Sequence, residues 1–378
     1  MKKIEMVDLK GQYNFIKDEV DRALEDVFQT TSFINGPTVQ EFQTNLEHYM
    51  GVKHVIPCAN GTDALQIALM GLSLSPGDEV VTPNFTFAAT VEVIALLKLK
   101  PVLVDVDPKT FMLNVDAVEK AITAKTKVIL PVHLFGQCAP MEPLLTLAQK
   151  HGIYVLEDNA QALGAVYTFS NGKKAKAGTI GHVGATSFFP SKNLGAFGDG
   201  GAIFTNDDAL AHSLRGIVNH GMYERYHHDV VGVNSRLDSI QAAILNVKLK
   251  YLDFYNEKRK TAALHYNKAF AHSEALITPY REAQCDSHVY HQYTLQIKKG
   301  NRDELVQHLA DHNIPCGVYY PIPLHQQKAY ADPTEEDSSF PNTIQLCKEV
   351  ISLPMHTELA LDQIEFISKQ VLCFVNKV

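Results

Sequence analysis

Between about residues 37 and 205, short β-rich runs alternate with helical stretches, and this alternation restricts the fold more than any other feature of the sequence. Several of the runs are almost wholly apolar, as strands buried on both faces must be. Apolar residues spaced by three and four indicate helices between them. The pattern predicts an α/β fold whose mostly parallel sheet is covered on both faces by helices. The expected strands are 54–58, 79–83, 101–106, 127–132, 153–158, 185–189 and 201–205.

After residue 205 the pattern changes to long helical stretches followed by a shorter α+β region. We place a boundary inside the long helical run, which predicts a large domain over residues 1–250 and a small C-terminal α+β domain over 251–378. A chain of 378 residues is long enough for both. The expected helices are 207–216, 236 to about 271, 302–313 and 361–373, and the expected strands of the second region are 291–297 and 316–321.

The composition excludes several classes of function. The net charge is −8 with histidine neutral, which gives no electrostatic basis for binding nucleic acid or an anionic membrane. No apolar run approaches the roughly 20 residues of a membrane span, and the first residues carry charges where a signal peptide would be apolar. The six cysteines form no CxxC pair and are interpreted as buried thiols of a cytoplasmic protein. His308 and His312 have no third ligand nearby, so no metal is expected.

Ligands of open α/β sheets bind beyond the carboxyl ends of the strands, and three such ends carry useful residues. At the first, Gly61 and Thr62 follow a strand and open an amphipathic helix. A glycine there lets the backbone approach an anion closely, and the free N–H groups of the first helical turn favour a phosphate. A simple turn with Thr62 as the helix N-cap is the alternative.

The second strand end carries Asp158, which follows the apolar run 153–156. A carboxylate at this place can pair with the protonated ring nitrogen of a pyridine cofactor and keep the ring cationic. An ordinary turn or capping aspartate would look the same in isolation.

The third candidate is Lys192, which lies among Phe188, Phe189 and Phe197 and is followed by four glycines. An apolar, tightly turned setting disfavours the ammonium form and yields a nucleophilic amine suited to a Schiff base. A surface lysine in a glycine-rich loop is the alternative. The sequence contains neither GxxxxGK[ST] nor GxGxxG, so it supports neither an NTPase nor a dinucleotide-binding fold.

Taken together and in chain order, eight segments resemble the sugar aminotransferases of the DegT/DnrJ/EryC1/StrS family, which bind pyridoxal 5′-phosphate in the aspartate-aminotransferase (type I) fold. The resemblance covers nearly the whole chain. One such motif would be weak, whereas eight in the same order are highly specific. They are FINGP (33–37), CANGTDALQIAL (58–69), TPNFTFAAT (82–90), EDNAQALGA (157–165), TSFFPSKNLGAFGDGGAIFTND (186–207), GVNSRLDSIQAAIL (232–245), YYPIPLH (319–325) and SLPMH (352–356).

The resemblance implies the residues that act on the cofactor. Lys192 would form the Schiff base, Asp158 would bind the pyridine nitrogen, and Gln161 would contact the O3′ side of the ring. The presence of a lysine also excludes the dehydratase branch of the family, in which a histidine replaces it.

The same resemblance implies how the cofactor is held. Gly61, Thr62 and Ser187 correspond to the phosphate pocket, and Phe87 corresponds to the aromatic ring that stacks on the cofactor. Asn234 matches a residue that reaches the phosphate from the other subunit. A homodimer with shared active sites is therefore implied.

Within the family, the runs SRLDSIQAAIL, YYPIPLH and SFFPSKNLG are most similar to enzymes that aminate C3 of a UDP-linked 3-keto-2-acetamido sugar acid for surface polysaccharides such as O-antigen. Arg236 stands where a carboxylate-reading arginine is expected, again donated across the dimer. Its planar fork suits either a uronate or the side chain of L-glutamate. Tyr319, Tyr320 and His325 are the other implied substrate-binding residues. Tyr319 stands where these relatives usually have a histidine, so the sugar pocket is expected to differ at this position.

The arginines after Arg236 independently favour a sugar over an amino acid as acceptor. Amino-acid aminotransferases of this fold clamp an α-carboxylate with an arginine of the small domain. Arg259, Arg281 and Arg302 lie in polar contexts such as NEKRK and KGNRDE, and none has the expected setting.

The implied reaction is a ping-pong transamination. L-Glutamate displaces Lys192 from the cofactor and leaves as 2-oxoglutarate, and the aminated cofactor then converts the keto sugar nucleotide to its amine, with Lys192 as proton carrier in both halves. One alternative is a C3 or C4 aminotransferase of another UDP- or dTDP-linked keto sugar. The other is a non-catalytic regulatory protein on the same fold, against which Lys192, Asp158 and the net charge of −8 argue.

Overall fold

Seven strands form the central sheet of the computed structural model, which describes residues 2–332 and 335–376. Their order is β1-β9-β8-β5-β4-β2-β3, and within this sheet β9 runs antiparallel to both neighbours while the other pairs are parallel. The predicted mostly parallel sheet is therefore confirmed. The strands are β1 (His54–Cys58), β2 (Glu79–Pro83), β3 (Lys100–Val104), β4 (Thr126–Ile129), β5 (Tyr154–Asp158), β8 (Val183–Ser187) and β9 (Gly201–Thr205).

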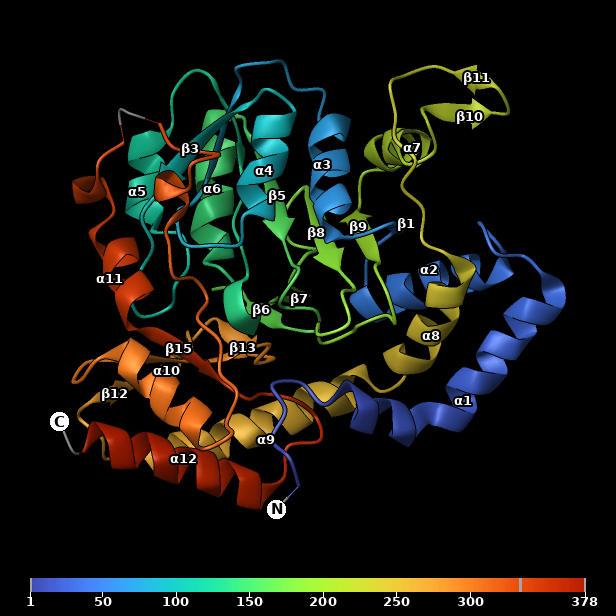
Figure 1. The fold of residues 1–378 in the computed structure, drawn as a ribbon. Coiled ribbons are helices and arrows are strands. Elements are labelled where there is room, and N and C mark those ends of the chain that lie inside the picture. The colour runs from blue at the N-terminus through green and yellow to red at the C-terminus, as the bar shows by residue number, and fades with distance from the viewer. Residues whose placement is uncertain (1, 333–334, 377–378) are drawn as a thin grey trace.

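Helices pack on the sheet as the alternating pattern predicted (Figure 1). Strands β2 and β9 are buried at every position, which is why their sequences lack polar alternation. Helix α3 buries nearly all its apolar residues because it packs on β8 and β9 and is flanked by α4 and α7. The helices are α2 (Pro37–Met50), α3 (Gly61–Gly71), α4 (Ala89–Leu96), α5 (Val115–Ala121), α6 (Met141–His151) and α7 (Asp208–Ile217).

The long helical run expected from 236 to about 271 is two helices, α8 (Ser239–Leu249) and α9 (Leu252–Phe270). The N-terminal helix α1 (Leu9–Thr30) packs along α8 (Figure 1). Elements of the C-terminal region build a three-stranded antiparallel sheet, in the order β12-β14-β15, with helices around it. They are β12 (Leu276–Ile277), β14 (Tyr293–Ile297), α10 (Arg302–Asp311), α11 (Pro341–Glu349), β15 (Val350–Leu353) and α12 (Leu361–Val375).

The strand expected over 316–321 does not form. Gly317 makes only an isolated bridge with Ser352 at the outer edge of β15, and the chain then leaves the sheet. The chain instead turns toward the carboxyl ends of the central strands, where Tyr319 and Tyr320 line a cavity.

The C-terminal sheet and helices have their own apolar core, drawn from residues 262–375 together with Ile4. Other residues after 250, such as Cys285 and Val289, belong instead to the apolar core around the central sheet. There β13 (Cys285–Ser287) pairs with β6 (Val166–Thr168), and β6 also pairs with β7 (Lys174–Lys176). The domain boundary near residue 250 stays a prediction, and the outermost residues of both predicted ranges lie outside the described residues. Within the part of the chain that the structure describes, no helix is long and apolar enough to cross a membrane.

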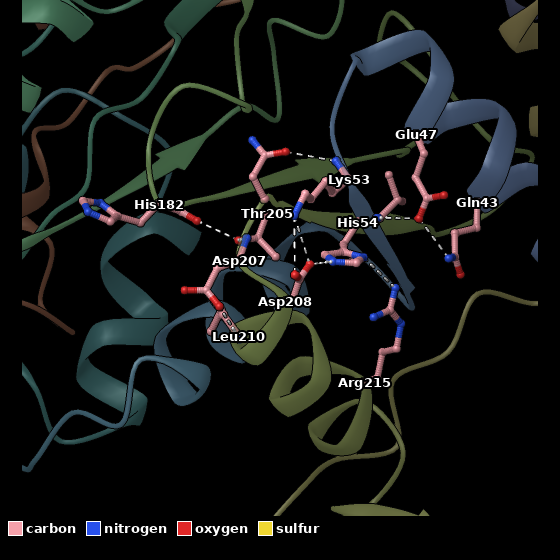
Figure 2. A network of polar contacts seen from close by, with 12 residues as sticks. Gln43, Glu47, Lys53, His54, His182, Thr205, Asp207, Asp208, Leu210 and Arg215 are labelled. Atoms are coloured by element: carbon pink, nitrogen blue, oxygen red, sulfur yellow. Dashed lines mark hydrogen bonds and ion pairs between the residues drawn. The ribbon is translucent and has the colours of Figure 1, made fainter.

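A polar network holds the start of edge strand β1 against α7 and α2 (Figure 2). His54 Nε2 donates to Asp208 at 2.7 Å, and Arg215 donates to His54 Nδ1 at 3.4 Å, which sets the histidine tautomer. Glu47 of α2 accepts from the Val55 amide at 3.0 Å. These contacts fix the strand whose carboxyl end leads into the start of α3.

Candidate active site

A cavity of ≈ 630 Å³ lies at the carboxyl ends of the central strands. The C-terminal half of the chain closes it with the segments 291–292 and 319–320. The structure brings most of the predicted site residues together here: Gly61, Thr62, Phe87, Asp158, Gln161, Ser187, Lys192, Tyr319 and Tyr320. The predicted residues Asn234, Arg236 and His325 do not line it.

The start of α3 forms one wall of the cavity against the end of β8. Asn60 is the N-cap and accepts from the Asp63 amide at 2.8 Å, so the alternative with Thr62 as cap is wrong. A Cβ on Gly61 would lie 2.5 Å from Ser187 Cβ, so only glycine lets the helix approach β8 this closely. The amides of the first turn and the Thr62 and Ser187 hydroxyls thus form a cup suited to a phosphate.

Asp158 ends β5 and is buried in the cavity wall. Its Oδ2 accepts from Thr90 Oγ1 at 3.0 Å, and its Oδ1 accepts from the Ala160 amide at 3.1 Å. Burial raises the pKa of this carboxyl, and the two hydrogen bonds and the Lys192 charge oppose the rise. A buried carboxylate held at both oxygens is ready to receive a cation.

The neighbouring Glu157 anchors the end of β5 from the opposite face. It is fully buried and accepts from the Gly178 amide at 2.8 Å and from the Ile180 and Gly181 amides, each at 2.6 Å. His133 Nδ1 accepts from a backbone amide, so its Nε2 donates to Glu157 at 2.7 Å. Glu157 lies in the motif 157–165, but nothing in the sequence predicts that it holds the Asp158 strand end in place.

Lys192 lies in a tight turn between β8 and β9. Its backbone amide donates to the Phe189 carbonyl at 2.8 Å, and a Cβ on Gly195 would lie 2.3 Å from the Pro190 carbonyl oxygen, so glycine is required for the turn. Burial lowers the pKa of the Lys192 amine to about 8, while the Asp158 charge acts in the opposite sense. The predicted tight turn is present, and the pKa of the amine moves in the predicted direction.

Gln161, in the cavity wall after β5, links this wall to the segment after 316. Its Nε2 donates to Tyr320 Oη at 3.2 Å, and its Oε1 accepts from the Phe135 amide at 2.8 Å. The rings of Tyr320 and Phe87 lie 6.3 Å apart between centroids, and Phe87 remains 58% exposed. An aromatic face is thus available to a flat ligand.

His325 has a different environment from the one the resemblance implied. It is buried, its Nδ1 accepts from Asn84 Nδ2 at 2.7 Å, and its Nε2 donates to Asp337 at 2.9 Å. The His325 amide also donates to Asn84 Oδ1 at 3.0 Å. His325 therefore connects the segment after 316 to the loop after β2, and it does not line the cavity.

Arg236 lines a second cavity of ≈ 240 Å³ together with Arg215, on α7, and residues of α2. Asn234 is exposed and forms an isolated bridge with Asn219. Neither residue borders the cavity of Lys192 in the same chain.

The three C-terminal arginines lie outside the Lys192 cavity. Arg259 is buried and donates to the carbonyl oxygens of residues 290, 291 and 355 at 2.9–3.4 Å. Arg302 donates to the carbonyls of residues 347 and 350, and Arg281 is exposed. The expectation that none of them serves as a carboxylate clamp in this cavity agrees with these positions.

Sequence reasoning missed several residues that line the cavity, including Asp199, His291 and Gln292. His291 is 5% exposed, and its buried Nδ1 finds no hydrogen-bond partner among the residues that the structure describes. Burial, helped by the charges of Lys192 and Arg259, holds its pKa well below the usual value. A histidine at the start of a strand carries no local signal of such a position.

The residues present fit pyridoxal 5′-phosphate by their own chemistry. The cup at Gly61 has no room for a side chain on the glycine and offers amides and hydroxyls for a phosphate. Asp158 supplies a buried carboxylate for a ring cation, and Lys192 supplies an amine with a lowered pKa. The arrangement can therefore bind a phosphorylated pyridine aldehyde and carry out amine chemistry on it.

Comparisons with known proteins agree with this interpretation. A model of the DegT/DnrJ/EryC1/StrS aminotransferase family matches residues 14–372. UDP-2-acetamido-2-deoxy-3-oxo-D-glucuronate aminotransferase of Pseudomonas aeruginosa is 46% identical over 364 residues, which cover 96% of this chain and 98% of that protein. A pleiotropic regulatory protein of Geobacillus stearothermophilus is 44% identical over 373 residues, which cover 98% of both proteins.

Two solved structures show the same fold over the whole chain. S. venezuelae DesV in complex with a ketimine intermediate has a TM-score of 0.95 and 36% identity, with 100% of both chains covered. A Bacillus subtilis protein with bound cofactor PMP has a TM-score of 0.90 and 28% identity, with 100% of this chain and 86% of that chain covered.

Proposed function

The chain belongs to the DegT/DnrJ/EryC1/StrS aminotransferase family and is a pyridoxal 5′-phosphate-dependent aminotransferase, and we propose that it carries the amino group of L-glutamate to C3 of a UDP-linked 3-keto-2-acetamido sugar. We take the sugar to be a uronate destined for a surface polysaccharide. The observation that carries the proposal is the meeting of Lys192, Asp158 and the Gly61–Ser187 cup in one cavity. The similarity to the Pseudomonas aeruginosa enzyme supports the choice of sugar.

Pyridoxal 5′-phosphate, when bound, supplies a carbon that holds the amino group and a pyridinium ring that accepts electrons. Asp158 would keep a negative charge at the ring nitrogen, because Thr90 and Ala160 hold both of its oxygens. Lys192 Nζ, with its pKa lowered to about 8, would move a proton from the Cα of glutamate to the cofactor in the first half-reaction, and from the cofactor to C3 of the sugar in the second. The first turn of α3 and Ser187 would hold the phosphate.

A second part of the proposal is a homodimer with composite active sites. Asn234 and Arg236 lie outside the Lys192 cavity of their own chain, whereas the resemblance assigns them to cofactor and substrate. Both can act if they serve the cavity of a second copy. The planar Arg236 guanidinium would then read a carboxylate of the sugar or of glutamate.

Half-reactions with a panel of keto sugar nucleotides test the substrate. The yellow holoenzyme should lose its colour with L-glutamate and regain it with the 3-keto sugar that it accepts. The UDP-linked uronate should restore the colour faster than its neutral hexose analogue or a 4-keto sugar. Fastest recovery with a 4-keto or dTDP-linked sugar would contradict the proposed substrate.

The variant Arg236→Ala tests whether this arginine binds the carboxylate of the uronate. If it binds the uronate, the variant should lose about ten- to a hundredfold more rate with the uronate than with the neutral analogue, since a charged hydrogen bond contributes about 1.5–3 kcal/mol. The comparison starts from enzyme already aminated, so glutamate binding does not enter. Equal losses would favour a neutral keto sugar.

The similarity to a pleiotropic regulatory protein makes a regulatory role the second candidate. The lowered pKa of Lys192 and the buried Asp158 favour catalysis, because a binding protein needs neither. A purified protein that stays colourless with the cofactor, or stays yellow with glutamate, would favour regulation. We also propose a cytoplasmic location, which the six free cysteines support.

A further inference from the structure

Lys248 is a buried lysine for which the proposed reaction has no role. It lies in the last turn of α8 and is 1% exposed, and among the described residues it forms no ion pair. Its Nζ donates to the Gly195 carbonyl oxygen and lies 5.4 Å from the centroid of the Phe197 ring. Burial, helped by the charge of Arg259, lowers its pKa to about 7.

Burying an amine without a counter-ion is unfavourable, and an apolar side chain of similar volume would avoid that cost. What the lysine adds over such a side chain is its hydrogen bond to the Gly195 carbonyl. Gly195 follows Lys192 by three residues in the same tight turn, in which the Ala196 amide donates to the Phe188 carbonyl at 2.7 Å. The hydrogen bond of Lys248 therefore acts directly on the loop that carries the reactive amine.

Two further side chains hold this loop, one from α8 and one from α9. Gln241 Oε1 accepts from the Phe197 amide at 2.8 Å. Asn256 Oδ1 accepts from Asn193 Nδ2 at 2.7 Å. Side chains of α8 and α9 thus contact the loop at residues 193, 195 and 197, and Lys248 is more buried than Gln241.

We propose that Lys248 is a positioning residue for the Lys192 amine, acting through the Gly195 carbonyl. Without it, the loop loses a fixed point three residues from Lys192, and the amine samples positions from which proton transfer is slow. The expected effect on turnover rests on the proposed function, whereas the expected effect on the loop does not.

Lys176 provides a matched control. Its Nζ also donates to a backbone carbonyl, that of Tyr49, and lies 3.4 Å from the centroid of the Tyr49 ring. Burial lowers its pKa as well. Lys176 is on β7 and does not line the Lys192 cavity. Lys176→Met therefore removes a comparable lysine without touching the loop.

The test compares Lys248→Met with Lys176→Met as holoenzymes. In Lys248→Met, amide hydrogen exchange in a peptide spanning 189–198 should rise at least tenfold. The rate of the half-reaction with glutamate should fall about ten- to a hundredfold, with KM within twofold, and the pH midpoint of the visible absorption should shift. Lys176→Met should show none of these changes. If the two variants behave alike in all four measurements, the proposal is wrong.

Gln241→Leu keeps the proposal testable if Lys248→Met folds poorly, because Gln241 is only half-buried. It removes the neighbouring contact with the same loop and should raise exchange in the same peptide and slow the same half-reaction. Unchanged exchange and rate would overturn the idea that α8 positions Lys192. A wild-type enzyme that does not react with glutamate would count against the proposed function, while the exchange comparison would still decide the role of Lys248.

Discussion

Replacing Asp158 with asparagine removes one charge from the cavity and little else. Asparagine has nearly the same volume, and its amide can still accept from the Ala160 N–H and pair with the Thr90 hydroxyl. Two unit charges about 4 Å apart attract by about 4 kcal/mol at an effective dielectric constant of about 20. Because about 1.36 kcal/mol corresponds to a tenfold change in rate, kcat should fall by about a thousandfold.

Single-turnover mixing of the variant with glutamate, followed by visible absorbance, measures this loss. Thr90→Val is the control, because it keeps the Asp158 charge and removes one hydrogen bond to the carboxylate, worth about 1.5–3 kcal/mol, so it should cost about ten- to a hundredfold. A fully loaded Asp158→Asn enzyme within tenfold of the wild-type rate would refute the role of this carboxylate. The residue that supports the pyridinium would then have to be sought elsewhere in the cavity.

Two further predictions concern the dimer and the amine. Inactive Lys192→Ala and inactive Asn234→Ala subunits, mixed and reassembled, should recover activity in hybrids with one intact site; inactive hybrids would contradict shared sites. Because burial lowers the pKa of Lys192 to about 8 and only the neutral amine is nucleophilic, cofactor uptake by the apoenzyme should speed up as pH rises through about 8 and level off above it. In Asp158→Asn the pH midpoint of cofactor uptake should move lower, because the charge that opposes the lowering is gone. A wild-type midpoint near the ordinary lysine pKa of about 10.4 would contradict the effect of burial on Lys192.

The central sheet could be predicted because its signals are local. The runs expected at 54–58, 79–83 and 201–205 coincide with β1, β2 and β9. The run 316–321 has a similar local pattern but forms no strand, since the chain leaves the edge of β15 after Gly317 and lines the cavity with Tyr319 and Tyr320. Which segment pairs with which is decided by contacts distant in sequence, and these leave no trace in a short run of residues.

The candidate site also contains residues that local sequence signals reveal and residues whose position depends on distant contacts. The strand-end rule and the motifs found Lys192, Asp158 and Gly61, because strand ends and glycine turns can be read along the chain. His325 shares a motif with Tyr320 but braces Asn84 instead of lining the cavity. Lys248 looks in sequence like any polar residue of a helix, and only the packing of α8 on the Lys192 turn gives it a role.

Borohydride reduction of the holoenzyme, followed by peptide mass spectrometry, tests the central claim most directly. Reduction fixes the cofactor on the lysine that holds it. The cofactor mass should be found on the peptide containing Lys192, and prior treatment with glutamate should prevent the labelling. A label on Lys248 or another lysine, or labelling that glutamate does not prevent, would contradict the account.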